Sequence, residues 1–138
     1  MEDYLEMAYR LCQEKGYTRV GKISEKLHVK PASASKMLSR LRELDYLEYD
    51  TYESIRLTSK GEELGEYLMK RHQIVEDFLQ LIGSTNSLLE TELVEHSLSP
   101  ETVSKLSRLV EFFESDRESK KKFEAYREKY EESEKRHS

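Results

Sequence analysis

Two short helical patterns joined by a tight turn constrain the fold of this chain more than any other feature. Residues 20–27 (VGKISEKL) place Ile23 and Leu27 on one helix face. After a turn at residues 28–30, Pro31 suits the first position of a further helix that we expect to reach Asp45. The inward stripe of that helix is Ala34, Met37 or Leu38, Leu41 and Leu44. The pattern predicts a helix-turn-helix whose second helix is the recognition helix.

Positive charge is concentrated on this pair of helices, although the chain as a whole is acidic. Between Arg19 and Arg42 seven basic residues stand against Glu25 alone, a net charge of +6, so a total of −5 leaves −11 on the remainder. Such a patch indicates a DNA-binding module attached to a part with another role, and a solvated helical face is the alternative. The residues expected to contact DNA are Lys30, Ser33, Ser35, Lys36, Ser39, Arg40 and Arg56.

The segments on either side complete a winged helix. Residues 46–49 and 54–57 are two short runs of aromatic and branched residues, which predict a hairpin in the position of a wing. Asp50 and Glu53 at its tip repel phosphate, so within the wing we expect only Arg56 and Tyr52 to help DNA binding. A first helix over residues 2–15 should end at Gly16. Its buried face would consist of Leu5, Ala8, Tyr9 and Cys12.

The second half of the chain reads as helices alone. We expect a long linker helix over 58–82, a helix over 87–96, and one that runs from the Ser99 cap to about Ser115 with an apolar stripe of Val103, Leu106, Val110 and Phe113. The charged tail, residues 116–138, is compatible with a solvated helix or partial disorder. The predicted fold is mainly α. A winged helix-turn-helix of three helices and a two-stranded wing (residues 1–60) precedes an all-helical dimerisation domain (61–138).

Three stretches of the sequence carry potential metal ligands, and in two of them the ligands recur at helical spacing. Each of these side chains has an ordinary explanation taken singly, but two such groupings in so short a chain favour a metal site. On the 87–96 helix the ligands share a side with Leu88, Leu89 and Leu93, so we expect them to face a packing surface, where charges need a partner. The six candidate ligands are Asp3, Glu6, His72, Glu92, Glu95 and His96.

The donor set also indicates the metal. Four carboxylates and two imidazoles without a thiolate suit manganese, although zinc would still bind. One octahedral ion fits six ligands, and so do two close ions that share Glu92 or Glu95. A single cysteine, Cys12, excludes an internal disulfide and agrees with the cytoplasm, and no stretch is apolar enough to span a membrane.

Taken together, the motifs MEDYLE, VKPASASKMLSRL, LTSKG, Arg71-His72 and ExxEH at 92–96 closely resemble the manganese transport regulators of the diphtheria toxin repressor family. The resemblance covers nearly the whole chain up to about residue 115. It implies a homodimer that binds a palindromic operator in double-stranded DNA and represses metal-uptake genes when metal is bound. It also implies a site for two Mn²⁺ ions. Asp3 and His72 would then bind one ion, Glu6 and His96 the other, and Glu92 and Glu95 both.

Other readings remain open on the sequence. A winged-helix regulator could respond to zinc or iron, or its ExxEH run could be structural. A binuclear metal hydrolase is a remote alternative, because nothing supplies a substrate pocket or an acid and base beyond the ligands. We therefore expect no catalysis, no small-molecule substrate and no membrane partner.

Overall fold

The computed structural model describes residues 1–137, so Ser138, the last residue of the charged tail, lies outside the described part. The chain forms two compact units, Met1–Lys70 and Arg71–Ser138. Their boundary falls inside helix α4 (Ser59–Leu81), which therefore contributes residues to both. Within the described residues, no helix is long and apolar enough to cross a membrane.

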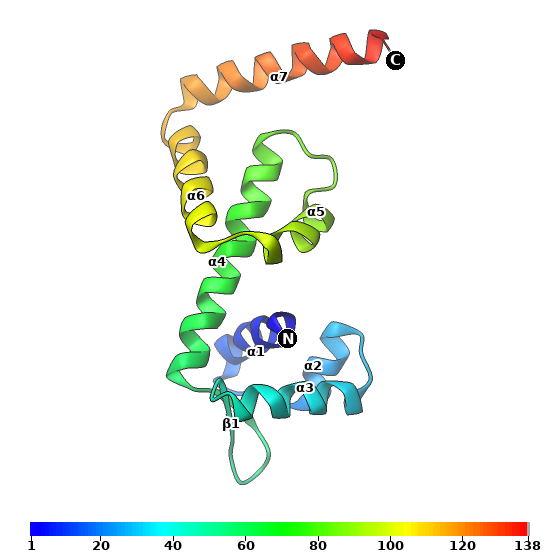
Figure 1. Cartoon of the computed structure of the whole chain (residues 1–138), viewed down its shortest axis with the longest axis vertical. Coiled ribbons are helices and arrows are strands. Elements are labelled where there is room, and N and C mark those ends of the chain that lie inside the picture. The colour runs from blue at the N-terminus through cyan, green and yellow to red at the C-terminus, as the bar shows by residue number, and fades with distance from the viewer. Residues whose placement is uncertain (138) are drawn as a thin grey trace. The chain divides into compact units, whose positions relative to one another are not determined.

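The first unit is a winged helix, as predicted. Helices α1 (Glu2–Lys15), α2 (Val20–Leu27) and α3 (Pro31–Glu43) precede the antiparallel strands β1 (Leu47–Tyr49) and β2 (Ile55–Leu57), and the helices gather above the hairpin (Figure 1). Apolar residues from all of these elements form one core, which also includes Leu68 from α4. Its buried members are Leu5, Ala8, Leu11, Ile23, Leu38, Leu41, Leu47, Ile55 and Leu68.

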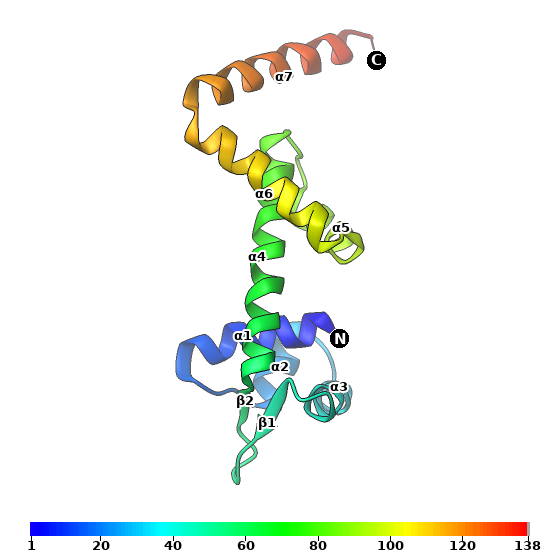
Figure 2. The same cartoon turned by 60° about the vertical axis from the view of Figure 1, so that its left-hand side comes forward.

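The base of the wing is tied to the loop that leads into α2. The Thr18 amide donates to the Ile55 carbonyl at 2.9 Å, and the Ile55 amide returns a bond to the Thr18 carbonyl at 2.8 Å. Beyond this bridge the hairpin projects away from the helices (Figure 2). The loop between α1 and α2 turns sharply at its start because Gly16 ends α1 in the left-handed conformation at φ 83°.

Glycine also permits the first turns of α4 to pack closely in this unit. A Cβ at Gly65 would lie 2.7 Å from the Cβ of Tyr9, and one at Gly61 would overlap the carbonyl of Tyr46. Tyr9, which we expected to be buried, is half-buried, because its ring lies against this glycine face at the edge of the core. Leu11 is buried in addition to the predicted residues of α1.

In its described residues the second unit consists of helices joined by short connections. The C-terminal part of α4 is followed by α5 (Ser87–Val94), a 3₁₀ turn η1 (Glu95–Ser97), α6 (Pro100–Ser115) and α7 (Arg117–His137). The Ser99 side chain accepts from the Thr102 amide and caps α6, as predicted. The charged tail is helical over Arg117–His137, and the Phe113 and Phe123 rings, 5.4 Å apart, join α6 to α7.

Several expected positions differ in the structure. Helix α3 ends at Glu43 and leaves Leu44 as a 45% exposed C-cap. The α5 helix stops at Val94, because the chain tightens into η1 before the cap of α6. In the apolar stripe of α6, which could form an interface or an internal core, Val103 and Val110 are buried within the chain. By contrast the leucines expected to face packing are exposed, namely Leu88 (54%), Leu89 (50%) and Leu93 (71%).

Candidate metal centre and nucleic-acid interface

The outer face of α3 presents the side chains that the sequence assigns to DNA. Pro31 starts this helix, and Ala34, Leu38 and Leu41 fix its orientation by entering the core. The opposite face is left to solvent because the apolar residues of the helix lie on the inward side. The exposed residues are Lys30, Ser33, Ser35, Lys36, Ser39 and Arg40, and Arg56 on β2 is exposed as well. A recognition helix needs this arrangement of small hydroxyls and cations.

Asp50 has a structural role at the wing tip that the sequence reading missed. Its carboxylate accepts from the backbone amides of Tyr52 and Ser54, each at 2.9 Å. The hydrogen bond from Ser54 is the main cause that holds the pKa of Asp50 below its ordinary value. Arg19 also contacts the wing, since its Nη1 donates to the Tyr52 carbonyl at 3.2 Å. The acidic tip therefore shapes the hairpin turn, and Arg19 adds a basic residue beside it.

Two candidate ligands lie one turn apart on α1 in the first unit. Asp3 is exposed and Glu6 is half-buried. Glu6 forms an ion pair with Arg10, at 2.8 Å between Oε1 and Nη2. Because Leu5 and Ala8 of the same helix are core residues, α1 positions both carboxylates on the winged helix itself.

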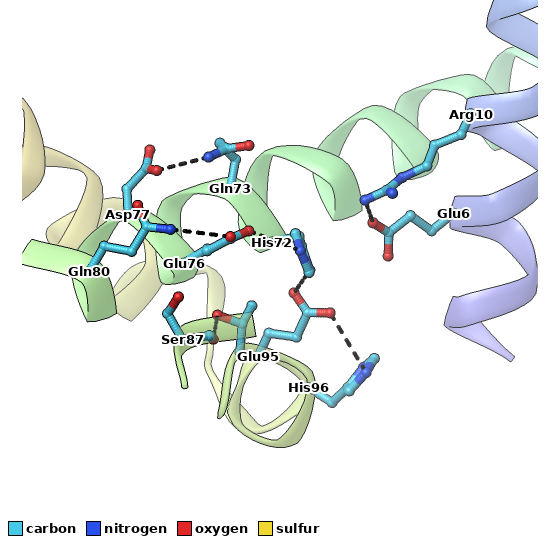
Figure 3. A network of polar contacts seen from close by, with 11 residues as sticks. Glu6, Arg10, His72, Gln73, Glu76, Asp77, Gln80, Ser87, Glu95 and His96 are labelled. Carbon is cyan, nitrogen blue, oxygen red and sulfur yellow. Dashed lines mark hydrogen bonds and ion pairs between the residues drawn. The ribbon is translucent and has the colours of Figure 1, made fainter. Parts of the chain in front are cut away.

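In the second unit, the candidate ligands His72 and His96 lie on either side of the candidate ligand Glu95 (Figure 3). Its side chain is 3% exposed, and its Oε2 lies 3.3 Å from Nδ1 of His72. Its Oε1 lies 3.8 Å from Nε2 of His96, which is too long for a hydrogen bond. Each oxygen of a buried carboxylate thus faces an imidazole. Glu92, the remaining candidate, is exposed on α5.

Two further residues contact these ligands and were not identified from the sequence. The Nε2 of His72 lies 3.4 Å from Oε2 of Glu76, one turn further along α4. The Nη2 of Arg71 lies 3.2 Å from Nδ1 of His96. The His-x-x-x-Glu spacing could have indicated Glu76, because residues four apart meet on a helix. No sequence signal predicts the contact of Arg71, which depends on how α4 meets η1.

The donors of this cluster suit a divalent cation of intermediate hardness. Among the side chains that the structure describes, no three histidine, cysteine or carboxylate groups already form a cluster that could hold an ion. However, the oxygens of the buried Glu95 carboxylate face two imidazole nitrogens, and carboxylate and imidazole are ligands that Mn²⁺ and Zn²⁺ accept. The second nitrogen of His72 faces Glu76, as a metal-binding histidine commonly faces an orienting carboxylate. The residues present therefore fit a metal ion.

Comparison with known proteins identifies the family. Residues 1–55 match the N-terminal DNA-binding domain of the iron-dependent repressors, and residues 58–124 match the metal-binding and dimerisation domain of the same family. These two domains define a metal-dependent DNA-binding transcriptional repressor, a class of regulator and not of enzyme. The chain belongs to the iron-dependent repressor family.

Individual relatives agree with this assignment. The HTH-type transcriptional regulator MntR of Bacillus velezensis is 41% identical over 133 residues, which cover 95% of this chain and 94% of that protein. The MntR of Shouchella clausii is 42% identical, with 84% of this chain and 82% of that protein covered. The solved structure of the manganese regulator SloR is 28% identical with a TM-score of 0.72. It matches 80% of this chain, and the chain spans about half of its length, 53%.

Proposed function

We propose that this protein is a manganese-responsive repressor of metal-uptake genes, with the metal as corepressor. Residues 1–60 would bind a palindromic operator, and residues 61–138 would bind metal and form the homodimer. The observation that carries the proposal is the buried carboxylate of Glu95, which faces the imidazoles of His72 and His96. The relatives named MntR and the manganese regulator SloR support manganese as the metal.

The proposed ligand set takes residues from both units. Asp3, Glu6, His72, Glu92, Glu95 and His96 would hold two Mn²⁺ ions. A bound divalent ion neutralises the mutual repulsion of four carboxylates and so stabilises the one arrangement in which all of them converge. Asp3 and Glu6 belong to α1, which packs against the recognition helix α3. Binding of a metal ion by these two residues would therefore limit the positions available to that helix.

Operator binding would depend on this limit to the positions of the recognition helices. Two recognition helices of a homodimer must be separated by one helical turn of DNA, about 34 Å, or a multiple of it, to enter successive major-groove faces. In the metal-free protein no ion links Asp3 and Glu6 to the other ligands, so the two recognition helices of the dimer sample other separations. The coupling between metal and DNA binding is then the difference in free energy between these states. A regulator that binds operator DNA would work in the cytoplasm.

Exposed apolar side chains support the homodimer. Leu88, Leu89 and Leu93 on α5 and Leu109 and Phe112 on α6 are each at least 42% exposed in the single chain. Large apolar side chains left exposed in a single chain can mark a protein interface. This family's second domain is a dimerisation domain, so a second copy of the chain is the partner we assign to these side chains.

Calorimetric titration with manganese tests the proposed site. We expect Glu95→Gln to weaken binding by about a hundredfold or more, since even residues that only orient a ligand contribute about 10- to 100-fold. Glu101→Gln is the matched control, because Glu101 is an exposed glutamate that pairs with Lys105 on α6. A wild type that binds no manganese, or a Glu95→Gln variant that binds it normally, contradicts the proposal. Operator binding measured with manganese, zinc and iron in turn decides which of these metals activates the protein, because affinity alone follows the general order of the divalent metals.

A further inference from the structure

A buried arginine accompanies the proposed metal ligands. Arg71 directly precedes His72 on α4 and is only 5% exposed. Its guanidinium stays protonated in proteins, so its charge is permanent. The Nη2 of this group lies 3.2 Å from Nδ1 of His96. The cluster of candidate ligands in the second unit therefore already contains one fixed positive charge.

The contact fixes the hydrogen-bonding state of the histidine. Guanidinium nitrogens donate hydrogen bonds and have no lone pair to accept one, so Nη2 of Arg71 donates and Nδ1 of His96 accepts. A neutral imidazole whose Nδ1 accepts carries its proton on Nε2. That nitrogen is directed toward Oε1 of Glu95 at 3.8 Å. In this state neither ring nitrogen of His96 has a lone pair available for a metal ion.

We propose that Arg71 holds His96 by a hydrogen bond in the metal-free protein. This hydrogen bond must break when a divalent metal ion binds His96. This inference rests on the proposed function, since it treats His96 as a metal ligand. Arg71 does not bind metal itself, because it offers no electron pair. It supplies positive charge next to His96 until an ion does so, and metal affinity is lowered because the hydrogen bond between Arg71 and His96 has to be broken.

Replacing Arg71 separates this role from a purely structural one. Arg71→Met keeps an unbranched side chain but removes both charge and donors. We expect manganese to bind about tenfold more tightly, the size of one hydrogen bond to a charged group. The melting temperature of the metal-free variant should fall, and the rise in melting temperature on adding manganese should exceed that of the wild type. A residue that only supports the fold would lower stability and leave manganese affinity unchanged.

Two controls complete the calorimetric experiment. Arg117→Met makes the same substitution at an exposed position on α7 and should leave manganese affinity unchanged. Arg71→Lys keeps the charge but loses the planar group, so its affinity should fall between those of the wild type and Arg71→Met. If Arg71→Met binds manganese as the wild type does, or more weakly, the inference is overturned. A wild type that binds no manganese overturns the proposed function as well.

A measurement on the wild type is independent of whether the variants fold. Nitrogen-15 correlation spectra of the metal-free protein near pH 8 report which ring nitrogen of His96 is protonated. We expect the proton on Nε2, with Nδ1 as the acceptor. A proton on Nδ1 would contradict the contact with Arg71 and overturn the inference.

Discussion

His72 and Glu95 join helix α4 to the turn η1 through a separation of 3.3 Å between Nδ1 and Oε2. These two residues are 23 positions apart in the sequence and come from two different elements. The Glu95 carboxylate is buried, and this pair belongs to the metal site that we propose. The other contacts of His72 and Glu95 then influence the affinity of this pair for a metal ion.

Glu76 should strengthen metal binding through His72. Its Oε2 lies 3.4 Å from Nε2 of that ring, where a carboxylate fixes the tautomer and orientation of a metal-binding histidine. We expect Glu76→Gln to weaken manganese binding by about tenfold in calorimetry. Asp77→Asn, at the next position and paired with Gln73, is the control that should have no effect. Equal affinity of the Glu76→Gln variant and the wild type would show that His72 needs no such partner.

The exposed apolar face of α5 should hold the homodimer together. Leu93 is 71% exposed in the single chain, so Leu93→Asp would place a charge in the proposed interface. We expect sedimentation to show a dimer for the wild type and a shift toward monomer for this variant. Leu44→Asp, at the 45% exposed end of α3, should remain dimeric. A Leu93→Asp protein that sediments as a dimer would remove this face from the interface.

Lys36 should contribute to operator binding from the exposed face of α3. Replacing it with alanine removes one cation from each subunit, so we expect weaker binding in the metal-loaded state. If Lys36 contacts phosphate, the slope of log affinity against log salt concentration falls by about one per lysine, or about two per homodimer. Lys105→Ala, on α6, is the control. An unchanged affinity and slope would exclude Lys36 from the interface.

Asp50 should stabilise the wing turn in a pH-dependent way. Its pKa lies below the ordinary 3.8, so its contribution is present above that value and is lost as the pH falls through the lowered pKa. We expect Asp50→Ala to lower the melting temperature at pH 7, and the gap from the wild type to narrow below about pH 4. Asp50→Asn keeps an acceptor oxygen and should lie between them. Equal melting temperatures of Asp50→Ala and the wild type at pH 7 would rule out this role.

The sequence predicted the local elements well because their signals are local. Gly16 at a left-handed helix end, Pro31 at a first helical position and the Ser99 cap each depend on a few neighbouring residues, and the structure confirms all three. The wing and the order of helices follow from the same kind of signal. The resemblance to a known family then provided the fold of both halves.

The errors arose where tertiary structure decides. Helical spacing shows that Leu93 belongs to an apolar face, but it cannot distinguish a core from a surface that awaits a partner. The stripe of Val103 and Val110 has similar spacing and is buried within the chain. The contacts of Arg71 with His96 and of His72 with Glu95 connect separate elements, so no local pattern predicts them.

The affinity of the wild-type protein for an operator duplex, measured by fluorescence anisotropy with and without manganese at one salt concentration, tests the central claim most directly. We predict that manganese tightens operator binding by at least tenfold, within the usual range of about 5- to 150-fold for coupling between two sites. The same affinity with and without manganese would contradict the account.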